Sequence, residues 1–335
     1  GTGHIVYPLL PVIYETAHQS GIRPERPMAI ATIASQQAIT ASPVAAATAA
    51  MIGLFTEKGL TQWGLPEILM ICVPATLTGV VAGAIVSMFL GKDLKDDPEY
   101  QARLAAGKIP APQAAGERPP LKPAARLSAY LFLSGVALVV LFGFLPELRK
   151  LPGAKSPLGM PIVIEIVMMA VAAIMLMATR VNVDEVPRTA TLRAGVVAVI
   201  GIFGLAWLGD SFIAAHKEVI VPAIGHWAEA APWTFAFGLF FASVLLYSQA
   251  ATTRALMPLG VALGIPPQFL IAMFPSVNGY FFIPTYGSLI AAINFDLSGT
   301  TRIGRYVVNH SFMIPGLVAT SVAVTSGLLL ARVMF

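Results

Sequence analysis

Two nine-residue segments in this chain place hydrogen-bonding side chains within strongly apolar surroundings. SQQAITASP runs from Ser35 to Pro43, and SVNGYFFIP runs from Ser276 to Pro284. Each segment begins with Ser, carries an amide side chain at its third position and ends with Pro. Hydroxyl and amide groups in such a setting can donate hydrogen bonds to an anion. The two segments therefore predict a ligand-binding site.

The proline that ends each segment predicts a break in a helix. Proline lacks a backbone N–H and clashes with the carbonyl four residues earlier, so we expect breaks at Pro43 and Pro284. The half-helix after each break would offer unpaired N–H groups and a positive dipole end to an anion. The predicted binding residues are Thr2, His4, Ser35, Gln36, Gln37, Thr40, Ser42, Ser248, Gln249, Thr252, Arg254, Ser276, Asn278, Gly279 and Thr285.

The two segments belong to a longer repeat. LLPVIYETAHQSGIRP ends at Pro24 and LMPLGVALGIPP ends at Pro267, and both lead through a Gly-Ile-x-Pro turn into one of the segments. By the order of the spans, four full crossings separate the two broken helices, so the repeats have inverted topology. One such segment alone is more often a structural kink. Two matched ones are typical of a transporter site near the middle of the membrane.

Four other residues each allow a functional and a structural interpretation. The Arg254 guanidinium either clamps a carboxylate or pairs with another group near the membrane interface. Asp210 either binds a proton or sodium ion or caps the following helix. Glu165 is a proton site, extends toward the interface or bonds to a neighbouring helix. For His310 we expect a structural role.

No residue pattern of an enzyme accompanies these groups. The five histidines are scattered without metal-ligand spacing, and the single cysteine permits no disulfide framework. G-x-S-x-G and P-loop motifs and paired catalytic carboxylates are all absent from the sequence. We therefore expect no metal and no cofactor. The competing hypotheses are an integral-membrane enzyme acting on an acidic metabolite or lipid, and a membrane subunit that anchors or senses.

The composition is that of a protein that crosses a membrane several times. The 335 residues are 56% hydrophobic and 11% charged, with a mean hydropathy of +0.77. Soluble domains are about 25% charged. The net charge of +4 is not a nucleic-acid signal. Uncharged runs long enough to cross a bilayer occur at Met28–Thr56, Ile68–Gly91, Leu127–Pro146, Ile166–Thr179, Ala194–Gly209 and Ser311–Ala331.

One long polar connection, Lys92–Arg126, divides the chain. It is expected to be a solvent loop between a first half, residues 1–91, and the connecting spans and second half, residues 127–335. Most Lys and Arg residues fall on the side of this loop. The positive-inside rule therefore places the loop in the cytoplasm and the C-terminus, Phe335, outside. Because the chain starts at Gly1 without Met, we expect that its N-terminus is incomplete.

Several longer motifs carry a family resemblance. The chain resembles the anaerobic C4-dicarboxylate transporter family, the Dcu type, through GTGHIVY, IRPERPMA, ASQQAITASPVA, YSQAA, IPTY, FDLSGTTRIGRY and NHSFMIPG. The resemblance implies a bacterial inner-membrane carrier that exchanges fumarate, malate, aspartate and succinate in growth without oxygen. It also implies that about a hundred family residues precede Gly1. Gly287, where a proline is expected, and Glu165, where an uncharged residue is expected, depart from the family pattern.

The resemblance extends to fold and partners. The wider ion-transporter superfamily is similar in having inverted repeats, two re-entrant hairpins and elevator-like movement. We therefore expect an all-α polytopic membrane protein with broken helices, in which GTGH and SQAATT form the hairpin tips. The implied partners are C4-dicarboxylates, the lipid bilayer, a second copy in a homodimer and a sensor kinase, but no nucleic acid. The alternative within this superfamily is an ion-coupled symporter of dicarboxylates or other organic anions.

Overall fold

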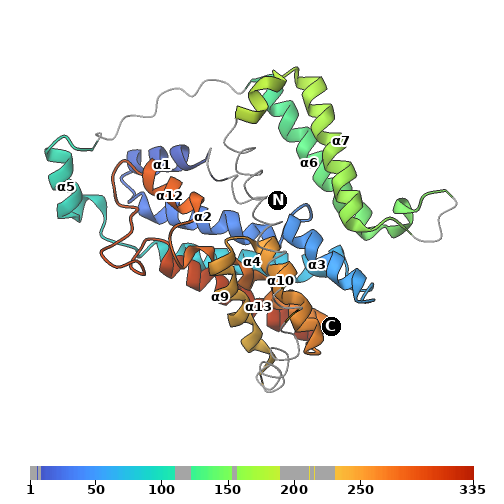
Figure 1. Ribbon diagram of the computed structural model, residues 1–335. Coiled ribbons are helices and arrows are strands. Elements are labelled where there is room, and N and C mark those ends of the chain that lie inside the picture. The colour runs from blue at the N-terminus through green and yellow to red at the C-terminus, as the bar shows by residue number, and fades with distance from the viewer. Residues whose placement is uncertain are drawn as a thin grey trace.

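The computed structural model describes residues 6, 9–109, 122–152, 157–188, 211, 215 and 231–335. These residues are mostly helical, and one isolated bridge joins Ile303 to His310. The helices of the first half are α1 (Leu10–Gln19), α2 (Glu25–Thr40), α3 (Ala46–Glu57) and α4 (Leu65–Ser87). Those of the second half are α9 (Phe235–Leu246), α10 (Gln249–Ala262), α11 (Pro267–Met273), η6 (Phe274–Phe281), α12 (Gly287–Phe295) and α13 (Met313–Met334). Figure 1 shows both sets packed together.

The connection between the two halves adds further helices. They are η2 (Leu94–Asp96), α5 (Pro98–Ala105), α6 (Pro123–Phe144), η3 (Pro146–Arg149), α7 (Met160–Thr179), η4 (Val183–Arg188) and η5 (Pro232–Thr234). Helices α6 and α7 pack against each other and extend away from α5 in Figure 1. The predicted span Ala194–Gly209 lies outside the described residues.

Four of the described helices are long and apolar enough to cross a membrane. They are α4, α6, α13 and the Ile162–Thr179 part of α7. Large apolar side chains on their outer faces are exposed, including Leu77, Leu133 and Met169. In water such surfaces would be unfavourable, whereas lipid accepts them. The chain is therefore a helical, multi-pass membrane protein.

Two further apolar segments are interrupted. Helix α2 ends at Thr40 and α3 begins at Ala46, so the predicted run Met28–Thr56 consists of two helices with Pro43 between them. Helix α11 continues as the 3₁₀ helix η6 to Phe281, and α12 begins at Gly287, with Pro284 in the gap. Within η6, Asn278 has non-helical φ and ψ of −97° and 28°. Each break thus interrupts an apolar segment close to its buried amide residues, Gln36 and Gln37 in α2 and Asn278 in η6.

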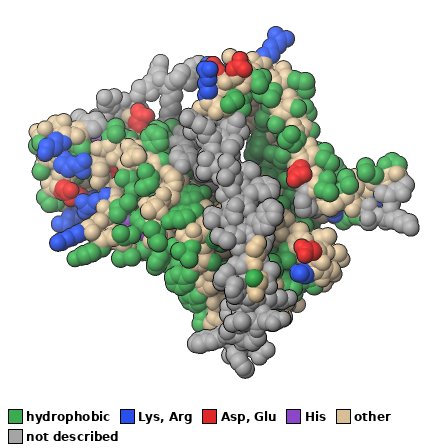
Figure 2. All heavy atoms as spheres, in the orientation of Figure 1, with side chains coloured by type: hydrophobic (Ala, Val, Ile, Leu, Met, Phe, Trp, Pro, Cys, Tyr) green, Lys and Arg blue, Asp and Glu red, His purple; other side chains and the backbone are tan. Residues whose placement is uncertain are grey.

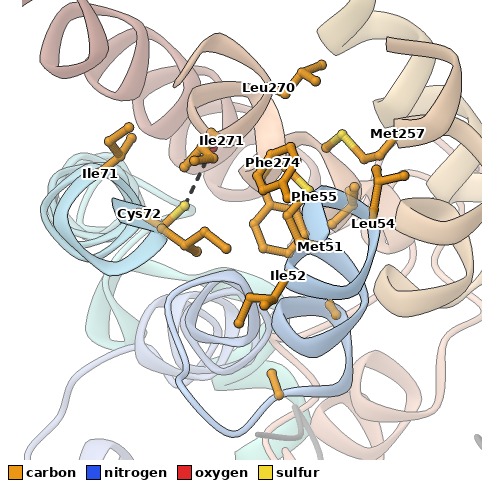
Figure 3. Packing of buried hydrophobic residues seen from close by; sticks show 14 of the residues in the cluster. Met51, Ile52, Leu54, Phe55, Ile71, Cys72, Met257, Leu270, Ile271 and Phe274 are labelled. Carbon is orange, nitrogen blue, oxygen red and sulfur yellow. Dashed lines mark hydrogen bonds between the residues drawn. The ribbon is translucent and has the colours of Figure 1, made fainter. Parts of the chain in front are cut away.

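The core between the halves is built from apolar side chains and close helix contacts. Figure 3 shows Phe55 of α3 beside Phe274 and Met257 from the second half, all part of one buried cluster. The Cys72 thiol of α4 donates to the Ile271 carbonyl oxygen over 3.5 Å. Helices α4 and α13 approach so closely that a Cβ at Gly79 would collide with the backbone of α13. Small residues permit such approach between membrane helices.

Packing between the halves is reciprocal. Helix α3 packs on α10 of the other half, and α12 packs on α1. Helix α2 packs on α4 and α11 packs on α13, while α4 and α13 contact each other along their lengths. The backbone N–H of Glu25, at the start of α2, donates to Thr300 Oγ1 over 3.1 Å, and that hydroxyl donates to Asp296, the residue after α12, over 2.8 Å. The first broken helix therefore begins where the second one ends.

The long polar connection is not wholly the solvent loop that its composition predicts. Its first part forms η2 and α5, with Leu94, Tyr100 and Ile109 buried in a small cluster. Arg23 fastens it to the first half, with Nη1 2.5 Å from Asp97 Oδ2 and Nε 2.6 Å from Glu25 Oε2. Composition reports the polarity of such a segment but not the distant partner on which it packs. Figure 2 shows Lys and Arg side chains gathered at this end of the molecule.

Candidate functional site

Four amide side chains from both halves meet in the buried centre. Gln249 Nε2 donates to Gln36 Oε1 over 2.9 Å and to Asn278 Oδ1 over 3.2 Å. Asn278 Nδ2 in turn donates to Gln37 Oε1 over 3.2 Å and to the Pro275 carbonyl over 3.1 Å. Gln37 and Asn278, which occupy matched places in the sequence repeat, are therefore in direct contact. We call Gln36, Gln37, Gln249 and Asn278 the amide network.

Two hydroxyl groups complete the amide network. Gln37 Nε2 donates to Thr320 Oγ1 of α13 over 2.8 Å, and Gln36 Nε2 approaches Ser288 Oγ of α12 at 3.4 Å. A carboxamide nitrogen carries two N–H groups. Those of Gln249 and Asn278 are both occupied, whereas Gln36 and Gln37 each have one N–H without a partner among the described residues. The network can therefore offer donors to a ligand with little rearrangement.

Other predicted binding residues mainly bond to their own chain segment. The hydroxyls of Ser35, Thr40 and Thr252 donate to carbonyls three or four residues earlier in their helices. Ser42 Oγ accepts from a backbone N–H in the first break, over 3.4 Å. Ser248 caps α10 by accepting from Ala251 N over 3.2 Å. These five hydroxyls therefore lie in α2, in the first break and at the start of α10, and none of them bonds to the amide side chains of the network.

Three predicted residues lie at the second break. The backbone of Gly279 fits tightly against α9, because its N–H donates to Ser243 Oγ over 2.8 Å and an added Cβ would lie 2.6 Å from the same oxygen. Ser276 is buried at the edge of an apolar groove. Thr285 is exposed, and its Oγ1 lies 2.6 Å from the hydroxyl oxygen of Tyr247.

The helices that follow the breaks start with free backbone donors. Neither Ala45, the N-cap residue of α3, nor Tyr286, that of α12, caps its helix with a side chain. Uncapped N–H groups and the positive end of the helix dipole favour an anion. Ser288 lies in the first turn of α12 and contacts the amide network, so this helix start is adjacent to the site.

Arg254 lines a groove that begins at the first break. The groove has a volume of about 910 Å³ and includes Val44, Ala45 and Ala46 at the start of α3, with Glu165 of α7 on its wall. Arg254 and Glu165 are both exposed. Within the described part of the chain, Arg254 forms no ion pair within 4.0 Å. Its guanidinium can therefore bind an anion that enters the groove.

A second groove lies next to a hydrogen-bond partner of the amide network. It is formed by α9, η6 and α13, has a volume of about 450 Å³, and is lined mainly by apolar side chains, several of them aromatic. Ser276 and Thr320 are its polar lining residues nearest the network, and Thr320 accepts the hydrogen bond of Gln37. Of the two grooves, this mainly apolar one is linked to the network through Thr320, whereas the groove that contains Arg254 is lined by none of the four amide residues.

His310 lies in the loop before α13, away from the amide network. Its Nδ1 accepts from Phe312 N over 3.2 Å, and its side chain is buried. Burial lowers the pKa of His310, which favours the neutral ring. In the same loop the Asp296 carboxylate accepts from Ser298 N over 3.0 Å and from Thr301 N over 2.5 Å. These contacts fix the loop rather than form a ligand site.

Sequence reasoning missed some residues and could not be tested at others. Thr2, His4 and Asp210 lie outside the described residues. Ser288, Thr320 and Tyr247 were not predicted. Ser288 follows the IPTY motif closely and Tyr247 opens YSQAA, so both had a nearby signal, whereas Thr320 is one of several hydroxyls in an apolar helix.

The chemistry that this arrangement offers is binding. The described residues contain no group of three His, Cys, Asp or Glu side chains that could hold a metal ion. The network consists of neutral amides and hydroxyls, and the uncapped start of α12 contacts it through Ser288. Such groups bind and orient carboxylates without attacking them.

Comparison with known proteins agrees with this chemistry. The family described as anaerobic C4-dicarboxylate membrane transporters matches residues 1–335. The C4-dicarboxylate transporter DcuA of Wolinella succinogenes is 39% identical over 337 residues, covering 100% of this chain and 76% of that protein. The anaerobic C4-dicarboxylate transporter DcuB of Escherichia coli O6:H1 is 38% identical over 338 residues, covering 99% and 75%.

A third relative, DcuA of Escherichia coli K12, is 39% identical over 336 residues, which cover 100% of this chain and 76% of that protein. No solved structure matches the chain. The matches extend over both halves and the connection between them.

Proposed function

This chain belongs to the family of anaerobic C4-dicarboxylate membrane transporters, and from that premise we propose how its residues bind and move the substrate. It is a transporter of C4-dicarboxylates and not an enzyme. The substrate binds at the amide network, between the two broken helices. The observation that carries this proposal is the direct contact of Gln37 with Asn278, 241 residues apart in the chain.

The charge of the substrate explains the neutral site. A C4-dicarboxylate at pH 7 carries two carboxylates, and each needs several hydrogen-bond donors. The amide network and the two uncapped helix starts supply donors from opposite halves of the chain. Neutral donors stabilise the anion without fixing it as strongly as a buried ion pair would, and a carrier must also release its substrate.

Arg254 supplies the one positive side chain of this proposal. Its position in the groove of about 910 Å³ places a guanidinium on the path from solvent to the first break. Such a group can bind one carboxylate with two parallel hydrogen bonds. Arg254 then distinguishes substrates with two carboxylates from those with one.

The reciprocal packing supports an inverted repeat. In the repeat, α1 to α4 correspond in order to α10, α11, α12 and α13. The contact of α3 with α10 therefore corresponds to the contact of α12 with α1. Likewise, the contact of α2 with α4 corresponds to that of α11 with α13. Helices α9 and α10, each too short to cross a membrane, pack together on either side of Tyr247 and Ser248. We infer a re-entrant hairpin here and elevator-like movement of the substrate site.

The proposed setting is the inner membrane of a bacterium. The end of the molecule that carries Arg23, Arg26, α5 and Arg302 faces the cytoplasm, and Phe335 faces the periplasm. Cysteine labelling of intact cells at Lys108 and Phe335 tests this orientation, and a reactive Lys108 site with a protected terminus would reverse it.

Three further expectations stay predictions from the resemblance: a homodimer, a sensor-kinase partner and about a hundred family residues ahead of Gly1. The family match over residues 1–335 does not support the last of these.

Exchange is the proposed mode of transport. Purified full-length protein in proteoliposomes should take up radiolabelled fumarate faster when the vesicles contain succinate than when they contain none. Butyrate inside the vesicles, which has one carboxylate, is the matched control and should not accelerate uptake. Uptake that depends on an imposed sodium or proton gradient, and not on internal succinate, would instead support an ion-coupled symporter.

A further inference from the structure

Tyr247 has a backbone conformation that is unusual for its residue type. It ends α9 with φ 50° and ψ 21°, in the left-handed region, and Ser248 after it starts α10. Glycine is the common residue at such helix ends, because a side chain in this region is strained. The tyrosine side chain must therefore be held by contacts that compensate for this strain.

Two side-chain contacts join Tyr247 to the second broken helix. Its hydroxyl oxygen lies 2.6 Å from Thr285 Oγ1. Its ring stacks on Tyr286 with centroids 6.3 Å apart and an interplanar angle of 10°. Tyr286 in turn packs edge-on against Tyr280 at 5.0 Å, and the Tyr280 hydroxyl donates to the Thr32 carbonyl of α2 over 3.3 Å. A row of three tyrosines thus joins the α9–α10 turn to both broken helices.

These contacts adjoin the amide network without belonging to it. Only Ser248 separates Tyr247 from Gln249, which donates to Gln36 and Asn278. Thr285 comes shortly before Ser288, which lies against Gln36. Tyr247 therefore fixes the distance between the start of α10 and the start of α12, two elements that present donors to the site.

Hydrogen-bond direction adds a chemical role. Thr285 is exposed and has one hydroxyl proton. If Thr285 donates that proton to a carboxylate, its oxygen can still accept, and the Tyr247 hydroxyl is the group placed to donate to it. Hydrogen bonds arranged in such a chain strengthen one another. A phenylalanine at this position would leave Thr285 free to rotate and to donate elsewhere.

We propose that Tyr247 is a positioning residue for the dicarboxylate: its hydroxyl orients Thr285 and holds the start of α12 against the substrate. This inference rests on the proposed function and concerns the same site. It assigns to Tyr247 an effect on substrate binding, transmitted through Thr285, and not a direct contact with the substrate.

Tyr247→Phe in the full-length protein tests the proposal, because it removes the hydroxyl and keeps the ring. In proteoliposomes the KM for fumarate should rise about threefold to tenfold, the effect of one hydrogen bond, with little change in maximal rate. Thr285→Val should raise KM similarly, and the double variant should be no worse than the more impaired single one. Tyr130→Phe, which alters an exposed tyrosine on α6, is the matched control and should keep the wild-type KM.

Tyr247→Gly distinguishes the effect of the tyrosine side chain from the effect of the left-handed backbone conformation. Glycine adopts the left-handed conformation readily, so this variant should reach the membrane at wild-type level while its KM rises at least as much as that of Tyr247→Phe. Two results would overturn the proposal: an unchanged KM in Tyr247→Phe, or effects of Tyr247→Phe and Thr285→Val that multiply independently. Failure of the wild-type protein to transport fumarate would instead remove the proposed function itself.

Discussion

At the scale of single residues, Arg254 is the proposed determinant of substrate class. It is exposed on α10, in the groove that begins at the first break, and no acidic side chain among the described residues lies within 4.0 Å of it. A guanidinium in this position interacts with whichever carboxylate first reaches it. Its contribution should therefore depend on how many carboxylates the ligand carries.

Arg254→Gln should weaken competition by succinate much more than competition by butyrate. The reason is that a ligand with two carboxylates loses one of its charge-assisted contacts, about 1.5–3 kcal/mol or roughly tenfold or more in affinity. Competition against labelled fumarate in the full-length protein measures both ligands. Arg254→Lys is the control, since it keeps the charge but loses the planar fork. Equal weakening of the two competitors, with less protein in the membrane, would assign Arg254 to structure.

At the scale of elements, the sequence predicted the interruptions and their relation to each other. Pro43 and Pro284 each lie in a gap between helices, and the repeat alignment paired Gln37 with Asn278, which are in contact in the structure. The interruptions follow from local chemistry, because proline removes a backbone N–H donor and disfavours continuation of a helix, although α4 and α10 continue through Pro74 and Pro258. Sequence patterns of this kind predict relations only between residues that are close in the chain or matched by the repeat.

Contacts between distant and unrelated segments were beyond that reasoning. The bond between Tyr247 and Thr285 joins two motifs that were noted separately. The docking of α5 involves Arg23, which the sequence identified only as part of the IRPERPMA motif. No local pattern states which acidic residue a buried arginine will pair with.

The docking of α5 should depend on pH. Burial alone would raise the pKa of Asp97, but hydrogen bonds from the Arg23 guanidinium and from the Tyr100 and Glu99 N–H groups outweigh it and hold the pKa below its ordinary value. A depressed carboxyl pKa contributes stability above the unfolded-state value, near pH 3.9, and that contribution is lost as pH falls through the folded-state value. Helix α5 should therefore stay docked at neutral pH and loosen in acid.

Thiol labelling can follow this loosening. A cysteine at Ile109, which is buried beside α5, should react slowly at pH 7, and Arg23→Gln should increase its rate. A cysteine at Lys108, which is exposed, is the control and should react at the same rate in both backgrounds. If the cysteine at position 109 reacts quickly in the wild-type background, α5 is not docked on the first half of the protein in its membrane setting.

At the scale of the whole molecule, the two halves present their broken helices to one another. The start of α2 lies beside the end of α12. The packing is reciprocal: α3 of the first half packs on α10 of the second, and α12 of the second half packs on α1 of the first. In the proposed function, a substrate at this junction would contact donors from both halves, and movement of one set of helices against the other would change the side from which the amide network is reached.

The central claim is that the two halves form one dicarboxylate site, and a double-mutant cycle on Gln37 and Asn278 tests it most directly. The half-saturating concentration of fumarate would be measured for exchange by the wild type, Gln37→Ala, Asn278→Ala and the double variant, at matched protein levels. Each single change should raise it about tenfold, since a hydrogen bond to a charged ligand contributes roughly 1.5–3 kcal/mol. Because the two amides touch, the double variant should be far less impaired than the product of the single effects. Unchanged half-saturation in both single variants would remove the amide network from the site, and effects that multiply independently would contradict a single shared site.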